Sequence, residues 1–416
     1  MSHSRRLANL PPYPFARWAN DVAHARQRGL DVIRLDIGNP DMPPPDEVIE
    51  MLCRSARLPD RHGYPDYRGI PALREAMAAY YDRRFGVPLD PERQVIPLMG
   101  SKEGLINLAL ATLDSGDLVL VPDPAYVPYT RGAILAGAEV YAFPLLAEHG
   151  FLPDLDAIPE DLADRATLIW LNYPNNPTGA TADRGFLARA VDFARCHELL
   201  LCHDAPYCDV TYDGYEAPSV LQVPGASEVA IEFNSLSKLA NMAGWRIGML
   251  VGNDQVVEAV ARVKSNVDSG IFRPLQEAAI VALSIDPAWL VKRNAVYRER
   301  LGILVDGLQQ MGLEASCPHA TLYLWAKIPE TGGTGALPTR TSEGFARMLL
   351  EETGVAVAPG SFFGHAGEGF IRVSATAPTP RIEEARRRLL AFELPGTPTI
   401  AQGKTTIVGH NEAGER

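Results

Sequence analysis

Short apolar runs alternate with longer amphipathic stretches through the middle of the chain. Strand-like runs occur at 95–98, 118–121, 140–143, 167–171, 199–202 and 229–233. Helical spacing of apolar residues follows at 102–113, 129–136 and 185–197. Because short buried strands separated by helices pair in parallel, this order predicts an α/β fold with a mainly parallel sheet between helices.

The two ends of the chain have a different pattern. A short strand is predicted at 31–36, with helices at 47–56 and 71–85. Beyond about residue 285, a long helical pattern at 289–311 precedes a strand at 321–327. We therefore expect a large domain over residues 45–300 and a smaller α+β domain built from 1–44 and 301–395. Residues 396–416 are polar and aperiodic, and they are predicted to form a tail.

Composition narrows the class of protein. Hydrophobic residues make up 46% and charged residues 22%, which is enough apolar material for a large core and excludes a mainly disordered chain. The net charge of −12 argues against nucleic acid as a partner. The absence of a long apolar run predicts no membrane span and no signal peptide. Five cysteines without a CxxC pair favour free thiols in the cytoplasm.

Glycine and proline clusters directly follow several of the predicted strands. They include Gly100-Ser101-Lys102-Glu103-Gly104 and the segment 172–179 (NYPNNPTG). In open parallel sheets, ligands bind at the carboxyl ends of the strands. A turn between a strand and a helix also offers free backbone N–H groups to a phosphate. The clusters therefore predict a ligand site at this edge of the sheet.

The stretch with the most chemical information is Ser235-Leu236-Ser237-Lys238, which precedes Arg246 by eight residues. Two hydroxyls and a guanidinium are suited to a phosphate. Nearby cations disfavour the charged form of a lysine, and a neutral amine can form a Schiff base. The stretch comes just after a predicted strand, and there is no helical periodicity around Lys238. The alternative for such a lysine is a solvated surface position.

Asp204 ends a predicted strand and is followed by Pro206-Tyr207. A carboxylate at that place can hold a pyridine nitrogen protonated, while Asn176 and Tyr207 can donate to a phenolic oxygen. Four motifs are now in place: 100–104, 172–179, 204–207, and 235–238 with Arg246. Together they resemble the fold-type I aminotransferases of class I and II that depend on pyridoxal 5'-phosphate (PLP). The resemblance covers about residues 10–395. It implies a large domain with a mainly parallel mixed sheet and a smaller α+β domain.

The resemblance also implies roles for individual residues. The catalytic set is Lys238, which binds the cofactor covalently, with Asp204 at the pyridine nitrogen and Tyr207 at the ring hydroxyl. Asn176 contacts the same hydroxyl and Tyr126 stacks on the ring. The phosphate is held by Ser101, Lys102, Ser235, Ser237 and Arg246.

Substrate and partner follow from the same resemblance. Arg372, in Phe370-Ile371-Arg372-Val373-Ser374, matches the arginine that binds the substrate carboxylate, with Gly38 beside it. Tyr64 matches a tyrosine that reaches the phosphate of the neighbouring subunit. A homodimer with shared active sites is therefore implied.

Within the family, the chain is most similar to the LL-diaminopimelate aminotransferase group. Tyr13 and Asn266 match positions that line the substrate pocket there, and Asn266 is, with Tyr64, a candidate to reach across to the neighbouring subunit. Tyr67 stands where the plant form has a glutamate. The implied reaction moves an amino group between LL-diaminopimelate and 2-oxoglutarate, in lysine biosynthesis. The alternatives are another donor (alanine, an aromatic amino acid or N-succinyl-diaminopimelate), a non-transaminating PLP enzyme of this fold, or a PLP-binding protein without turnover.

Cysteines and histidines recur every six residues at Cys196-His197, Cys202-His203 and Cys208, which resembles a set of metal ligands. Zinc sites favour ligand pairs two to four residues apart in one turn. Here the first pair ends a predicted helix and the second lies in a strand whose side chains alternate between faces. We therefore expect core thiols and a packed histidine, and no metal.

Overall fold

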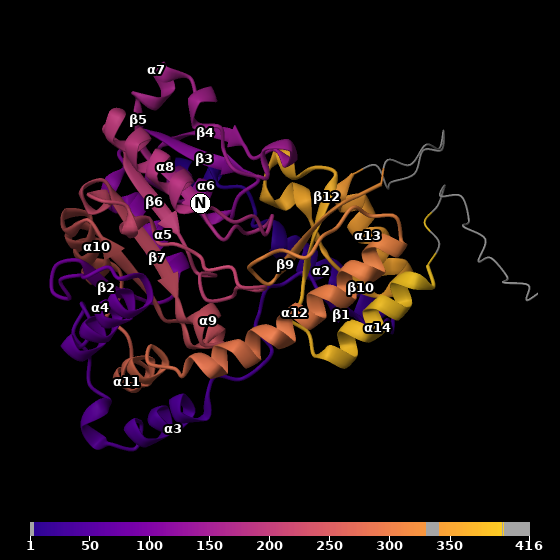
Figure 1. Cartoon of the computed structure of the whole chain (residues 1–416), viewed down its shortest axis with the longest axis horizontal. Helices are drawn as coiled ribbons and strands as arrows, with labels where there is room; N and C mark the ends of the chain where they lie inside the picture. The colour runs from indigo at the N-terminus through magenta and orange to yellow at the C-terminus, as the bar shows by residue number, and fades with distance from the viewer. Residues whose placement is uncertain (1–3, 330–340, 393, 395–416) are drawn as a thin grey trace, which may run out of the picture.

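A computed structural model describes residues 4–329, 341–392 and 394, and its centre is a mixed sheet (Figure 1). In the described part of the chain this sheet has seven strands, in the order β2-β8-β7-β6-β5-β3-β4. The neighbours from β7 to β4 pair in parallel, and β8 runs antiparallel to β2 and β7. The bounds are β2 (Val95–Leu98), β3 (Leu118–Asp123), β4 (Glu139–Pro144), β5 (Ala166–Asn172), β6 (Leu200–Asp204), β7 (Ala230–Ser235) and β8 (Gly248–Gly252).

Helices cover both faces of this sheet, and strands such as β5 and β7 are accordingly buried on both sides. Apolar side chains of one face pack against α5 (Ser101–Thr112), α6 (Pro128–Ala136) and α10 (Asp254–Val267). Those of the other face pack against α4 (Pro71–Phe85), α8 (Arg184–Cys196) and α11 (Arg273–Ala282). Outside this layer, α3 (Asp46–Ser55) lies against α11. The carboxyl ends of the parallel strands stay uncovered by these helices.

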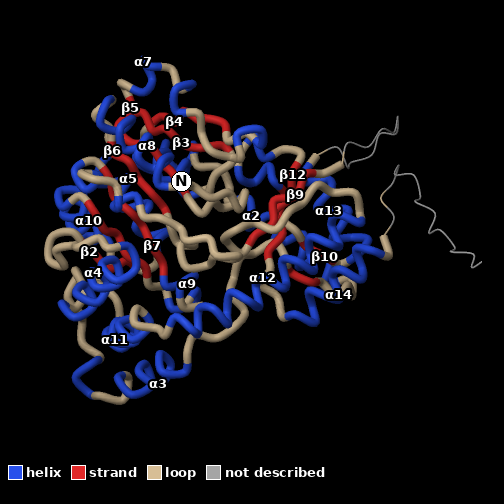
Figure 2. Tube along the Cα trace, in the orientation of Figure 1, coloured by secondary structure: helices blue, strands red, loops and turns tan. Residues whose placement is uncertain are grey.

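A second hydrophobic core forms beside the first from the two ends of the chain. Its strands are β9 (Tyr323–Lys327), β11 (Ala358–Pro359) and β12 (Phe370–Ser374), in an antiparallel sheet, and β1 (Ile33–Arg34) paired with β10 (Val355–Ala356). The helices α2 (Pro14–Gln27), α13 (Ser342–Thr353) and α14 (Thr379–Leu390) enclose them. Figure 2 shows β9, β10 and β12 on the opposite side of the molecule from β2.

One long helix and several short ones complete the fold. The helix α12 (Pro287–Gln310) runs from α9 (Leu236–Leu239) and α11, at the large sheet, to α14 in the second core (Figure 1). Two further helices are single turns at the surface, α1 (Arg5–Asn9) and α7 (Glu160–Ala163). No helix in the described ranges is both long and apolar enough to cross a membrane.

The fold class predicted from the sequence is confirmed. One local prediction is wrong, and one short helix was not predicted. The strand expected at 31–36 has two residues, Ile33 and Arg34, because its partner β10 is itself only two residues long. Lys238 lies in the four-residue helix α9, although its surroundings have no helical period. The domain limits at 44/45 and 300/301 stay a prediction, and 396–416 lies outside the described residues.

Candidate active site

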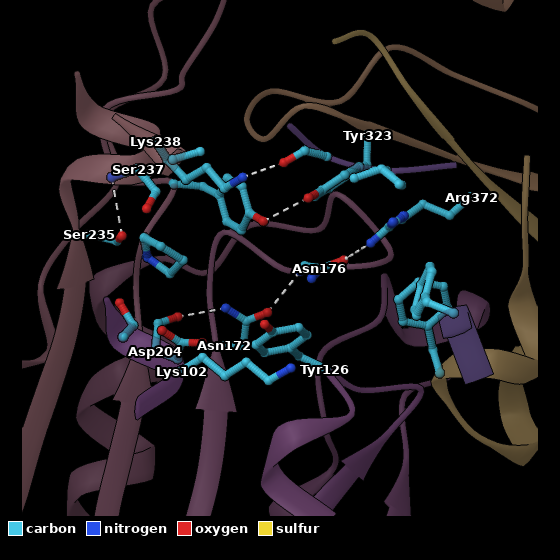
Figure 3. Close-up of a pocket in the computed structure, with 18 of the residues that line it drawn as sticks. Lys102, Tyr126, Asn172, Asn176, Asp204, Ser235, Ser237, Lys238, Tyr323 and Arg372 are labelled. Atoms are coloured by element: carbon cyan, nitrogen blue, oxygen red, sulfur yellow. Dashed lines mark hydrogen bonds between the residues drawn. The ribbon is translucent and has the colours of Figure 1, made fainter. Parts of the chain in front are cut away.

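A cavity of about 400 Å³ opens where the carboxyl ends of the large sheet face the second core. Such a volume falls in the usual range for small-molecule sites. Figure 3 shows Lys238, Ser235 and Ser237 on one side of this cavity, Arg372 on the opposite side, and Asp204 and Lys102 below them. The predicted site residues that line it are Tyr13, Gly38, Ser101, Lys102, Tyr126, Asn176, Asp204, Tyr207, Ser235, Ser237, Lys238, Arg246 and Arg372.

Two predicted site residues, Tyr64 and Asn266, do not line this cavity. The side chain of Tyr64 is 92% exposed, and Asn266 is exposed in the last turn of α10. They nevertheless belong to neighbouring segments, because Gly270 packs closely against Pro65 and Asp66. Both therefore lie on one outer surface of the chain, and their expected roles require a second subunit.

The backbone around Lys238 is fixed from two sides. Ser235 caps α9, its hydroxyl accepting a hydrogen bond from the Ser237 N–H at 3.2 Å. At the other end, Arg293 of α12 donates to the carbonyls of Lys238 and Leu239 at 2.6 and 2.7 Å. A single helical turn is unstable on its own. The helix α9 is therefore stabilised by these contacts with Ser235 and Arg293, and not by its local sequence.

The amine of Lys238 faces the cavity and donates to the carbonyl oxygen of Gly38. Burial lowers the pKa of Lys238, and the cations Arg372 and Arg246 lower it further, against an opposing effect of Tyr323. These surroundings make the neutral amine, which is the nucleophilic form, easier to reach than it is for an exposed lysine.

Tyr323 is a cavity residue that the sequence did not indicate. Its hydroxyl lies 2.9 Å from that of Tyr207, and a Cβ on Gly38 would overlap it. Burial alone would raise the pKa of Tyr323, but Lys238 and Arg372 lower it overall. In the sequence Tyr323 is one buried position of a predicted strand, so nothing distinguished it from its core neighbours. Phe15, Phe363 and Asn172 also line the cavity and were not predicted as site residues.

Asp204 is the last residue of β6, and one of its two carboxylate oxygens accepts a hydrogen bond from another side chain. Its Oδ2 accepts from the Tyr129 hydroxyl at 2.6 Å, and its main-chain carbonyl accepts from the Asn172 amide at 2.6 Å. The other oxygen, Oδ1, is buried and has no hydrogen-bond partner among the described residues. Burial raises the pKa of Asp204 to about 6. A buried acceptor in this state is suited to a donor supplied by a ligand.

Cations gather at the N-terminal end of α5. Gly100, with φ of 80°, precedes the helix, and a Cβ there would overlap the Arg246 guanidinium. The ammonium of Lys102 lies 4.4 Å from the centre of the Tyr13 ring. Burial and the charge of Arg246 lower the pKa of Lys102. Free N–H groups at a helix N-terminus, beside two cations, are suited to a phosphate.

Arg372 is held rigidly on β12. Its Nη1 donates to Asn176 Oδ1 and its Nη2 to the Asp36 carbonyl, both at 2.7 Å. The rings of Tyr323 and Phe363 lie 4.2 and 4.6 Å from its guanidinium carbon. Its Nε is buried without a partner within residues 4–329, 341–392 and 394. A fixed guanidinium in an aromatic setting is suited to a planar carboxylate.

The recurrent cysteines and histidines have separate environments. Cys202 and Cys208 are buried, as expected, and His203 is packed with its Nδ1 2.8 Å from Glu232 Oε2. Cys196 is exposed, so its assignment as a core thiol is wrong; it is the last residue of α8 and lies on the side away from the sheet. No group of His, Cys, Asp or Glu side chains in the described ranges is arranged to hold a metal ion.

Comparisons with known proteins agree with this geometry. Residues 30–389 match the family described as aminotransferase class I and II. An LL-diaminopimelate aminotransferase of Moorella thermoacetica is 50% identical over 94% of this chain and 98% of its own length.

Solved structures give the same result. Substrate-bound BacF from Bacillus subtilis has a TM-score of 0.89 and 36% identity, over 96% of this chain and all of its own. A probable N-succinyldiaminopimelate aminotransferase from Thermus thermophilus has a TM-score of 0.83 and 38% identity, over 91% of this chain and 99% of its own. The chain thus belongs to the class I and II aminotransferase family, as its motifs predicted.

Proposed function

We propose that this aminotransferase binds PLP in the cavity and moves an amino group from LL-diaminopimelate to 2-oxoglutarate. The observation that carries the proposal is one cavity lined by the amine of Lys238, the unpartnered Oδ1 of Asp204 and the guanidinium of Arg372. The choice of substrate is supported by the Moorella relative, which is 50% identical over nearly the whole chain.

The residues present fit PLP. The buried Oδ1 of Asp204 would accept from the ring nitrogen, and Tyr126 would stack on the ring. Asn176 and Tyr207 would contact the ring hydroxyl. The phosphate would be held by Ser101, Lys102, Ser235, Ser237 and Arg246. When bound, PLP supplies the electron sink that makes cleavage of a bond to Cα possible.

The side chains around it would then orient the substrate and move its proton. Arg372 would bind the α-carboxylate and hold it in one plane, which leaves the Cα–H bond exposed to Lys238. The neutral amine of Lys238 would take the proton from Cα and later return a proton. Because Arg372 retains the carboxylate, this arrangement favours proton transfer over decarboxylation.

A different donor is the main alternative, and one observation favours it. The probable N-succinyldiaminopimelate aminotransferase from Thermus thermophilus is 38% identical, and the match covers 91% of this chain. Alanine and aromatic amino acids are further candidates. A PLP enzyme of this fold with another reaction, or a PLP-binding protein without turnover, is the less favoured alternative, since Lys238, Asp204 and Arg372 share one cavity.

We also propose a homodimer in which Tyr64 and Asn266 complete the partner's site. The outer surface that carries them also exposes Tyr67, Val267 and Phe272, at 48%, 60% and 40%. A second copy of the chain would cover these apolar side chains.

We propose the reducing cytoplasm as the location, because five cysteines without a CxxC pair are typical of that compartment.

The cofactor part of the proposal is tested by covalent attachment. Purified protein with PLP should absorb near the edge of the visible range, and borohydride reduction should leave the cofactor mass on the peptide that contains Lys238. Lys238→Ala should abolish both signals. Lys292→Ala, at an exposed lysine of α12, is the control and should retain both. A reduced adduct on another lysine would contradict the assignment.

A further inference from the structure

Tyr129 lies behind Asp204, outside the cavity lining. Its side chain is 1% exposed, and its hydroxyl donates to Asp204 Oδ2 at 2.6 Å. The ring stacks on Trp170 of β5, with centroids 4.6 Å apart and planes 11° apart. Since Trp170 belongs to the central sheet, this stacking fixes where the Tyr129 hydroxyl lies.

Tyr129 also contacts the residue that is expected above the cofactor ring. Its ring meets that of Tyr126 edge to face, with centroids 5.8 Å apart. Tyr126 precedes α6 and lines the cavity, whereas Tyr129 is in the first turn of that helix. One buried side chain therefore touches both Asp204 and Tyr126.

The hydroxyl of Tyr129 acts as a donor to Asp204. Burial raises the pKa of Tyr129 well above its usual value, so this group keeps its proton. A hydrogen bond donated to an ionised carboxylate stabilises the charged form, and it opposes the effect of burial on Asp204. Because Oδ2 is occupied, Oδ1 is the oxygen left for a ligand.

Other titratable groups near Asp204 are paired or lie across the cavity. His203, on the same strand, and Glu232, on β7, bind each other at 2.8 Å, and their charges act on Asp204 in opposite directions. Tyr207 and Tyr126 also face Tyr129 and keep their protons, because burial raises the pKa of each. Lys102, Lys238, Arg246 and Arg372 are the cations that line the cavity. Tyr129 is the group that donates directly to the Asp204 carboxylate among the described residues.

We propose that Tyr129 is a positioning residue, which keeps Asp204 ionised and directs Oδ1 into the cavity as the acceptor for the N–H of a pyridine ring. The inference rests on the proposed binding of PLP. Tyr129 touches neither substrate nor cofactor in this role, and it acts through Asp204.

Tyr129→Phe removes the hydroxyl oxygen and keeps the ring that stacks on Trp170. The measurement is the apparent dissociation constant of PLP for PLP-free protein, from tryptophan fluorescence, between about pH 6 and pH 9. Without the hydrogen bond, Asp204 should take up its proton at a higher pH than in the wild type. We expect the variant to bind PLP about tenfold more weakly near pH 7, because hydrogen bonds to charged groups are the strong ones. The two proteins should converge near pH 9, where Asp204 is ionised in both.

Tyr212→Phe is a matched control. The Tyr212 hydroxyl is buried and donates to the Thr321 carbonyl at 2.6 Å, so an equally short hydrogen bond is lost outside the cavity. This variant should keep the wild-type PLP affinity at every pH. Thermal unfolding of both variants establishes that each is folded at the assay temperature.

Two results would overturn the role of Tyr129. One is a Tyr129→Phe profile that coincides with the wild type. The other is a loss of affinity of the same size at every pH, which would indicate packing alone. If the wild-type protein itself did not bind PLP, that result would contradict the proposed function. A failure of the proposed function can therefore be distinguished from a failure of the role of Tyr129.

Discussion

Asp204 is a residue that is proposed to bind PLP but that lowers the stability of the folded chain when PLP is absent. The residue is 3% exposed, and Oδ1 has no hydrogen-bond partner within the described ranges. The folded chain without a ligand raises its pKa from 3.8 to about 6. Residues that serve a ligand often cost stability in its absence, because their groups are satisfied only when it binds.

Asp204→Asn should stabilise the PLP-free protein in a pH-dependent manner. The folded-state pKa lies above the unfolded value, so the native state holds a proton that the unfolded chain releases, and wild-type stability falls as pH rises from about 4 to 6. Asparagine avoids this loss. The expected gain is about 2–3 kcal/mol at pH 8, since one pKa unit corresponds to about 1.4 kcal/mol. Urea unfolding at several pH values measures it.

The gain should shrink toward pH 4, where the wild-type Asp204 is protonated in both states. If Asp204→Asn were less stable than the wild type at pH 8, the buried carboxylate of Asp204 would not lower the free energy of unfolding of the PLP-free protein. Tyr212→Phe, which leaves every carboxylate in place, should show no such pH dependence.

Residues whose identity is tied to a motif could be predicted from the sequence. Lys238, Asp204 and Arg372 each stand in a local pattern whose chemistry is recognisable, and all three reach one cavity. Tyr323 and Tyr129 could not be predicted, because what marks them is a partner far away in the chain. The hydroxyl of Tyr129 meets a side chain 75 positions later, and Tyr323 meets Tyr207 across 116 positions.

Among the elements, α12 connects the lysine to the second core. Arg293, near its start, donates to the carbonyls of Lys238, Leu239 and Asp209 at 2.6 to 2.7 Å. Two turns later Arg300 binds Asp41 at 2.7 Å, close in sequence to Gly38. The helix thus holds both the backbone of Lys238 and the segment that carries its carbonyl partner.

Arg293→Met should destabilise the fold by about 3 kcal/mol, because it leaves buried carbonyls unsatisfied. Arg298→Met, on the same helix, is the matched control. Arg298 forms an ion pair with Asp213 in which both side chains are partly exposed, so its loss should cost less than about 1 kcal/mol. Equal losses in urea unfolding would contradict the role of Arg293.

Elements with a clear period were predicted closely, whereas α9 was not. The pattern in α4 places Leu73, Met77 and Tyr81 on one buried face, and this spacing is visible in the sequence. Four residues contain no period, and α9 depends on Ser235 at one end and Arg293 at the other. The strand at 31–36 was predicted too long, since its length is set by β10, more than 300 residues later.

At the scale of the whole molecule, the proposed dimer makes each site depend on two chains. The side chain of Tyr64 is almost fully exposed on the single chain, so a second subunit could contact it. The family resemblance predicts a role for Tyr64 in the site of the neighbouring subunit.

Complementation between two inactive variants tests the shared site. Lys238→Ala and Tyr64→Ala should each have little activity alone. When the two chains are mixed and reassociated, half of the dimers are mixed, and one of their two sites has both native residues. Activity should therefore return to about a quarter of the wild-type level. A mixture no more active than its components would contradict the proposal that Tyr64 crosses between subunits.

The central claim is tested most directly by the choice of amino donor. Purified protein loaded with PLP is supplied with 2-oxoglutarate and one donor at a time, and the glutamate formed is measured. We expect rapid formation of glutamate from LL-diaminopimelate, loss of that activity in Lys238→Ala, and its retention in Lys292→Ala. Glutamate formed from alanine, an aromatic amino acid or N-succinyl-diaminopimelate, but not from LL-diaminopimelate, would contradict it.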